Sequence, residues 1–262
     1  MWQSGLAWIS AALKDVPLTY GFAGLLVLYA ILMLGWLRVG VAKDLAWGSV
    51  RAALQLFIVG LVLSYAFTLH QIVWQVLFLL IMAGFAAQTG ASRLKGLPRA
   101  FIISYIAVIT GAAVAMLPMV ALGTLKPLPQ ETLPIGGMML GNCMNGMVIG
   151  LDRFGSDVAK MWEAAEGAFA LGAKPRQVAA LFRKQAYAAG TVSFRNTMKV
   201  VGIVQIPGAA VGMLLAGVSP LKAMAFQLVI MYMLAAAVST AVAVGLSLGA
   251  VLYLRSKPVN MI

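Results

Sequence analysis

The sequence contains few of the residues that catalytic and metal sites use most often. Its 262 residues include one His, one Cys and only seven Asp or Glu. Because Cys143 is the only Cys, the chain cannot form an internal disulfide. There is no His-Glu-x-x-His motif, and no Gly-Lys dipeptide, which a phosphate-binding P-loop requires. We therefore expect a chain that is not an enzyme, binds no cofactor and does not hydrolyse ATP alone.

Charged residues are scarce as well, at 10% of the chain, whereas 62% of the residues are hydrophobic and the mean hydropathy is +0.96. Soluble domains are typically about 45–50% apolar, so most of this surface is expected to face lipid. The composition predicts an all-α polytopic integral membrane protein, with a single transmembrane domain over residues 1–262. About seven apolar runs are long enough to cross a bilayer as helices. They are residues 18–37, 46–69, 71–91, 100–122, 133–151, 197–216 and 221–251.

The charges are distributed unevenly around these runs. If the N-terminus is outside, sixteen of the 19 Lys and Arg residues lie inside, and only Lys14, Lys126 and Lys222 lie outside. The positive-inside rule then predicts an N-out, C-in orientation. This explains the net charge of +12 without a nucleic-acid partner, because the basic residues are separated by long apolar runs. Residues 1–17 lack the features of a cleaved signal peptide, so the first span is expected to direct insertion.

One connection between spans is long. Residues 152–196 are rich in Ala, Glu and basic residues, which favours helix over disorder. Ser156 is a candidate helix cap, Gly172 a candidate helix end and Pro175 a candidate first-turn residue. We therefore expect a cytoplasmic coupling segment of two short helices around residues 172–175.

A motif within this segment suggests a partner. Glu163-Ala164-Ala165 precedes Glu166-Gly167-Ala168, and Gly172 follows. This stretch resembles the Glu-Ala-Ala-x3-Gly loop with which ABC permeases dock onto their ATPase, and the resemblance implies coupling roles for Glu163, Glu166, Ala168 and Gly172. Small residues permit close approach, and Gly reverses the chain. The alternative is an Ala-rich amphipathic helix on the membrane surface.

A wider set of residues resembles the FetB-type iron-export permeases, a family that includes plant aluminium-tolerance permeases. The matching residues are Arg51, Gln55, Leu56, Gly60, Pro134 to Met138, Gly141 to Met144, Leu171 to Ala173, Asn196 to Met198, Val201 to Val204, Pro207, Gly208, Gly217 to Pro220, Phe226 and Gln227.

The resemblance implies a multi-pass permease of the plasma membrane, which is the inner membrane in bacteria. It implies a homodimer that binds an ABC ATPase subunit and exports iron or a related metal, with ATP bound only on the partner. The chain departs from the family pattern at Ala209, Ala210, Val211 and Met213, where two Met, a Thr and a Gln are usual, and at Ser193 in place of Pro. No metal ligand is assigned.

Polar residues in the fifth and later spans are candidates for the substrate pathway. Met138, Asn142 and Asn145 share one helix face with Gly137 and Gly141. That face suits either a pathway or tight helix packing with amides bonded across helices.

The sixth and seventh spans carry further candidates. Gln205 and Gln227 are either substrate contacts or bonds between helices, and Pro207 with Gly208 is either a hinge or a packing bend. Two other functions stay open, namely an ATP-independent channel or secondary transporter, and an ABC permease for a different small substrate. Proton coupling is disfavoured because Asp and Glu are confined to loops and helix ends.

Overall fold

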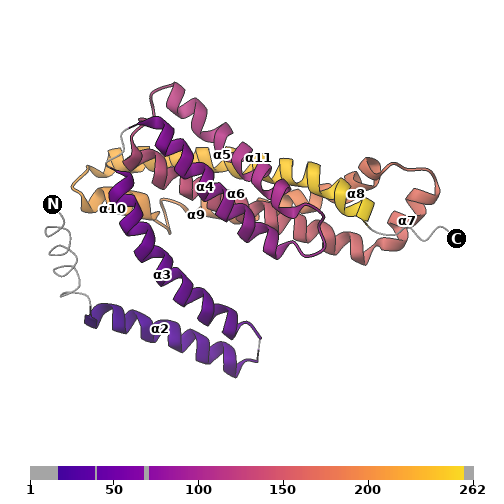
Figure 1. Ribbon diagram of the computed structural model, residues 1–262, viewed down its shortest axis with the longest axis horizontal. Coiled ribbons are helices and arrows are strands. Elements are labelled where there is room, and N and C mark those ends of the chain that lie inside the picture. Colours follow the sequence, from indigo (N-terminus) through magenta and orange to yellow (C-terminus); the bar gives the residue numbers. More distant parts are fainter. Residues whose placement is uncertain (1–16, 39, 68–70, 257–262) are drawn as a thin grey trace. The chain divides into compact units, whose positions relative to one another are not determined.

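The computed structural model describes residues 17–38, 40–67 and 71–256, and Figure 1 shows the helices that they form. These residues contain no strand, only an isolated bridge between Val201 and Gln205. The all-α prediction is therefore confirmed for this part of the chain. The chain divides into two compact units, residues 1–68 and residues 69–262.

The first unit consists of α2 (Pro17–Trp36) and α3 (Ala42–Ala66), which pack against each other. The chain reverses between them through Arg38 and Gly40, with φ angles of 53° and 77°. Both helices agree with the first two predicted spans. The sequence also predicts a tight hairpin at Leu69, His70 and Gln71 between the second and third spans. Leu69, His70 and the N-terminal residues 1–16 lie outside the described residues.

The second unit is built around four long helices. They are α4 (Ile72–Arg93), α5 (Ala100–Ala121), α6 (Pro129–Lys160) and α11 (Pro220–Ser256). Helix α11 packs along both α5 and α6. Helix α4 also packs on α5 and α6. The core is made of Ala, Val, Met and Leu side chains that are almost fully buried, and small residues allow close approach. A Cβ added at Gly111 of α5 would lie 2.5 Å from the carbonyl oxygen of Ala237 in α11.

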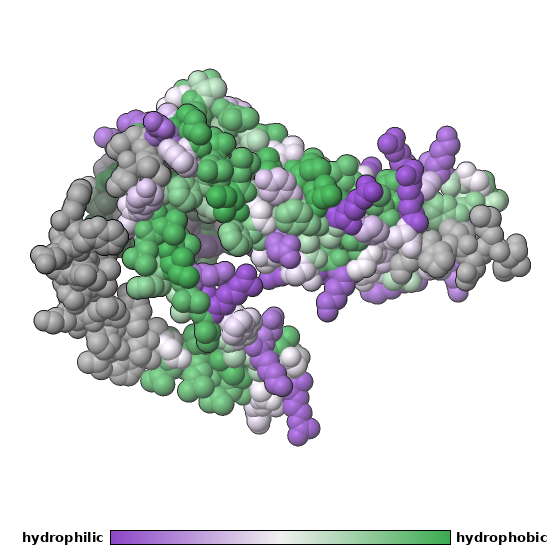
Figure 2. Space-filling model, in the orientation of Figure 1, coloured by the Kyte–Doolittle hydropathy of each residue, from purple (hydrophilic) through white to green (hydrophobic). Residues whose placement is uncertain are grey.

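Four of the described helices are long and apolar enough to cross a membrane, namely α3, α4, α5 and α11, and residues 24–36 of α2 form a shorter apolar helix. Helix α6 has the length but not the hydropathy, because Asn142, Asn145 and several glycines interrupt its apolar residues. In Figure 2, hydrophobic side chains cover much of the visible surface of the second unit, and hydrophilic ones gather towards the end where α7 and α8 lie.

The boundaries of the fifth predicted span require correction. The prolines before this span are expected to interrupt the helix, but α6 begins at Pro129 and continues through Pro134. Ser156 does not cap a helix either, since α6 runs on to Lys160. Phe154 explains this extension: its ring packs edge-on against Phe182 and Tyr253, with centroids 6.2 and 6.1 Å away, and it is 1% exposed. The burial of Phe154 therefore outweighs the tendency of Ser156 to cap a new helix.

Two helices flank Gly172 as predicted. Helix α7 (Trp162–Ala170) ends before Gly172, which has a φ of 86°, and α8 (Pro175–Gly190) begins after Lys174. The backbone N–H of Lys174 donates to Oε1 of Gln177 at 2.7 Å, which closes the start of α8.

The prediction of one continuous helix over residues 197–216 is wrong. The structure has α9 (Val192–Val200) and α10 (Gly208–Leu215), separated by residues 201–207. Gly202 has a φ of 85°, and the N–H groups of Val204 and Gln205 both donate to the carbonyl of Val200, so the helix unwinds there. Pro207 is the N-cap of α10 rather than a kink within a span. With eight residues, α10 is about 12 Å long and cannot cross a bilayer alone.

Candidate functional site

The second unit has polar residues at both of its ends. The distance between these ends along α6 serves as a scale for depth in the membrane. At one end, Thr132 Oγ1 donates to Gln75 Oε1 at 2.7 Å, and Gln75 Nε2 donates to the carbonyl of Pro127 at 3.0 Å. We call this the Gln75 end.

At the other end, a cavity of about 310 Å³ is lined by Arg93, Lys95, Asp152 and Ser156, together with apolar residues. We call this the Arg93 end. Along α6, Thr132 and Asp152 are about 30 Å apart at 1.5 Å per residue, which equals the hydrocarbon thickness of a bilayer. Asn142 lies halfway between them.

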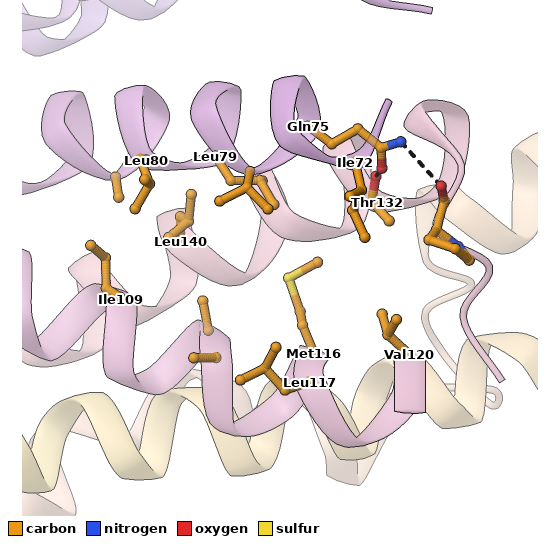
Figure 3. A pocket seen from close by; sticks show the side chains of 15 residues that line it. Ile72, Gln75, Leu79, Leu80, Ile109, Met116, Leu117, Val120, Thr132 and Leu140 are labelled. Carbon is orange, nitrogen blue, oxygen red and sulfur yellow. Dashed lines mark hydrogen bonds between the residues drawn. The ribbon is translucent and has the colours of Figure 1, made fainter. Parts of the chain in front are cut away.

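A second cavity, of about 230 Å³, lies near the Gln75 end between α4, α5 and α6. Figure 3 shows Leu79, Met116 and Leu140 around it, with Gln75 and Thr132 at its edge. The lining is otherwise apolar, and the two polar side chains are already bonded to each other. This cavity can hold a hydrocarbon group but offers no free ligand for an ion.

The candidate pathway residues of α6 lie on an open face. Asn142 and Asn145 are exposed, and nothing lies within 4 Å of a Cβ built at Gly141. Asn142 Nδ2 donates to the carbonyl of Met138, one turn away, at 2.8 Å. Within the described residues neither amide bonds to another helix, while Met138 is half-buried against the core. The polar part of the face is therefore free to meet water, ligand or another copy of the chain.

This open face begins where tight packing stops. Gly146 and Gly150 follow Asn142 on the same line of α6 at four-residue spacing, and both lie against α8. A Cβ added at Gly146 would be 2.8 Å from the carbonyl oxygen of Gly190, and one added at Gly150 would be 3.3 Å from that of Ala186. Helix α8 ends at Gly190, one turn short of Asn142, so that Asn142 is uncovered.

The other two candidate glutamines are not part of this face. Gln227 lies in α11 and is 3% exposed, and its amide nitrogen and oxygen have no hydrogen-bond partner in the described part of the chain. A buried amide without a partner costs about 1–3 kcal/mol, so this position of Gln227 is unfavourable for the isolated second unit. Gln205 lies in the break between α9 and α10 and is exposed. Pro207 and Gly208 form the start of α10.

The candidate coupling residues lie on and beside α7. Ala165 of α7 is fully buried, and Ala168 packs on the hydrophobic cluster formed by α6, α8 and α11. Glu163 is exposed in the first turn, Glu166 is half-buried, and Gly172 reverses the chain. Leu171 projects with 92% of its surface exposed. The elbow between α7 and α8 thus has one face fixed to the protein and an outer face with a carboxylate and a large apolar side chain.

Two basic residues follow the contact between α8 and α6. Arg195 and Lys199, which the sequence predicts on the cytoplasmic side, belong to α9, beyond the contact between Gly190 and Gly146. The sequence signal for this was the small-residue run Ala188-Ala189-Gly190, which permits close helix packing.

No candidate metal or catalytic site appears in the part of the chain that the structure describes. No group of three or more His, Cys, Asp or Glu residues gathers there. Residues Gly245 to Gly249 match a Gly-x-Ser-x-Gly pattern, but they lie in the middle of α11. In α/β-hydrolases the Ser of this pattern stands on a sharp strand-to-helix turn, so the pattern in α11 is not a nucleophile elbow.

Comparison with known proteins identifies relatives over most of the chain. It is 32% identical over 221 residues to the "Probable iron export permease protein FetB" of Escherichia coli (strain K12), covering 84% of this chain and 85% of that protein. It is 33% identical over 197 residues to the "UPF0014 membrane protein STAR2" of Oryza sativa subsp. japonica, covering 75% and 69%. It is 29% identical over 211 residues to "Protein ALUMINUM SENSITIVE 3" of Arabidopsis thaliana, covering 80% and 77%.

No solved structure matches the chain. The relatives and the apolar helices together establish a multi-pass membrane protein. Residues 17–253 match the family described as "Uncharacterised protein family (UPF0014)", and the chain belongs to that family.

Proposed function

We propose that this chain is the permease subunit of an ATP-driven exporter of iron or a related metal, that it acts as a homodimer, and that a separate ABC ATPase powers it. The family membership and the name of the Escherichia coli relative support the permease role and the cargo. The elbow between α7 and α8 supports the ATPase partner and is the observation that carries the proposal.

The directions of the helices in the second unit support a proposal of seven crossings. Helices α6 and α11 run parallel, because Met147 contacts the position of Gly245 and Leu151 contacts that of Gly249. The chain between them must therefore return from the Arg93 end to the Gln75 end. The end of α8, α9 and α10 together make this sixth crossing. If α2 and α3 count as the first two crossings, the proposal has the N-terminus outside and the Arg93 end on the cytoplasmic side, as the positive-inside rule predicts.

In this mechanism the elbow transmits movement. Closure of the two ATPase subunits would displace α7, whose buried face is joined to α6 and α8. Since α6 carries Asn142 and α8 ends beside it, displacement of α7 would change access to the open face of α6. This chain supplies the pathway and the docking elbow, and the partner supplies ATP hydrolysis.

The test is to co-express the chain with a candidate ABC ATPase subunit from the same genome and to purify the complex. Glu166→Lys and Gly172→Leu should insert normally but reduce ATPase binding and ATP-dependent transport about tenfold or more, because a reversed charge or a strained bulky residue disturbs the docking surface. Gly172→Asn, which tolerates a positive φ, and Lys222→Glu at the opposite end are the controls. Normal coupling in both first variants would disprove the docking assignment, and transport without any ATPase would favour a channel or secondary transporter.

A further inference from the structure

Helix α9 carries two basic residues at a depth where the bilayer is apolar. Gly190 lies against Gly146, and α8 runs antiparallel to α6, since Ala186 lies against Gly150. Helix α9 begins at Val192, directly after the α8 C-cap Thr191, and packs on α8 and α11. Counted at 1.5 Å per residue from Gly190, four residues reach the level of Asn142, the midpoint of α6 between its polar ends. Arg195 is one residue further, and Lys199 is about 6 Å beyond Arg195 along α9.

Neither residue has an acidic partner within the second unit. No Asp or Glu follows Glu166 in the sequence. Of the earlier ones in this unit, Glu131 lies beside Thr132 at the Gln75 end, and Asp152, Asp157, Glu163 and Glu166 lie at or beyond the Arg93 end. At the midpoint the charges of α9 are therefore not neutralised by a carboxylate of this unit.

The side chains are also open. Arg195, Asn196 and Lys199 are exposed, and no residue of α9 is fully buried. Arg195 Nη2 donates to the carbonyl of Ala188 at 2.9 Å, which fixes the guanidinium close to the end of α8 while leaving its other donors available. Asn142 of α6 is uncovered at the same depth.

Charged residues inside a membrane are costly unless they face water or an opposite charge. An arginine at mid-depth, far from both headgroup layers, cannot meet this requirement with lipid. Water that reaches two cations without a carboxylate of the same unit at their level is at a positive potential, which concentrates anions and repels free cations.

We propose that Arg195 and Lys199, close to the level of Asn142, form an electropositive site at mid-membrane that takes an oxyanion group, a carboxylate or a phosphate, of the transported ligand. The planar guanidinium of Arg195 suits such a group because its paired N–H donors match two oxygens. A metal ion then passes this site as an anionic complex rather than as a free cation. This statement of substrate class rests on the permease function proposed above.

The potential of the site is tested without any ATPase or cargo. Asn142→Cys in a Cys143→Ala background is placed in vesicles and reacted with two methanethiosulfonate reagents, one carrying a sulfonate and one a trimethylammonium group. The sulfonate reagent should react faster relative to its rate with a free thiol. Arg195→Gln together with Lys199→Gln should lower the ratio of the two rates at least about fivefold, because two charges within a Debye length are removed.

Lys222→Gln is the matched control, because it removes an exposed lysine at the far end of α11 and should leave the ratio unchanged. Two results would overturn the proposal. One is a Cys at position 142 that reacts with neither reagent, and the other is a rate ratio that is the same with and without the two basic residues.

The ligand class is tested on the complex with its ATPase. Ferric citrate or citrate should stimulate ATP hydrolysis more than ferrous ion alone, and the Arg195→Gln, Lys199→Gln variant should lose that stimulation while keeping ATPase binding. Equal stimulation of the variant and the unchanged protein by ferrous ion alone would refute the oxyanion site. Loss of ATPase binding in the unchanged protein would instead refute the proposed function and leave the labelling result intact.

Discussion

Gly146 and Gly190 set the distance between α6 and α8. A Cβ on Gly190 would lie 2.7 Å from the carbonyl oxygen of Gly146 and 2.8 Å from a methyl group of Val242. The first of these atoms is backbone and cannot move without shifting a helix. This contact sets the level of Arg195 relative to Asn142. A methyl group added at Gly190 would therefore affect both the stability of the protein and the geometry of the site.

We predict that Gly190→Ala destabilises the protein by about 1–3 kcal/mol, because overpacking forces the two backbones apart. The measurement is thermal unfolding in detergent, followed by the fluorescence of the native tryptophans. Gly84→Ala is the control, since nothing lies within 4 Å of a Cβ at this position of α4. It should be neutral or stabilise by up to about 1 kcal/mol. Equal effects of the two substitutions would show that the close contact is not formed.

At the scale of elements, the direction of each helix indicates the proposed membrane crossings more clearly than its hydropathy does. Helix α6 carries two Asn residues and a proline, yet it is the axis of the second unit, with α4, α5, α8 and α11 packed around it. The proposed sixth crossing consists of pieces that are each too short or too polar to be recognised as a span. It is inferred from the parallel arrangement of α6 and α11 instead.

The N-out orientation predicts which residues a membrane-impermeant thiol reagent reaches. In a Cys143→Ala background, single Cys substitutions of Lys14 and Lys126 should react from outside in intact cells. Substitutions of Lys95 and Arg183 should react only after the membrane is opened, because these residues belong to the cytoplasmic side of the N-out orientation. The opposite pattern at both pairs would reverse the orientation and leave the helix packing unaffected.

For the whole molecule, the open polar face of α6 and the exposed α9 are surfaces that a single second unit does not cover. Polar groups at membrane depth must meet water, protein or ligand. A cavity shared between two copies of the chain satisfies this requirement, and it agrees with the homodimer implied by the family resemblance.

We therefore predict a complex of two permease chains and two ATPase chains. Native mass spectrometry of the complex released from lipid nanodiscs measures this directly, and the ATPase expressed alone is the control. Exposed side chains such as Leu171 should become protected from hydroxyl-radical labelling in the complex, because they lie on the outer face of the elbow. A complex with a single permease chain that still transports would contradict the shared cavity.

The sequence by itself determined the membrane class, the all-α fold and the family, because these depend on composition, long apolar runs and motifs that persist along the chain. It also determined the elbow at Gly172, since a turn with positive φ has a local signal in glycine. Local signals failed at Ser156 and over residues 197–216. At both places the residue types are compatible with more than one backbone conformation, and tertiary packing determines which one forms.

Only the tertiary structure decided which residues share a depth. Asn142 and Arg195 are more than fifty positions apart, and nothing in their own neighbourhoods relates them. Their common level follows from the contact of Gly146 with Gly190, a backbone approach that depends on how two helices pack. Depth in the membrane is a property of the packed bundle, because the cost of a charge depends on what surrounds it rather than on the sequence that carries it.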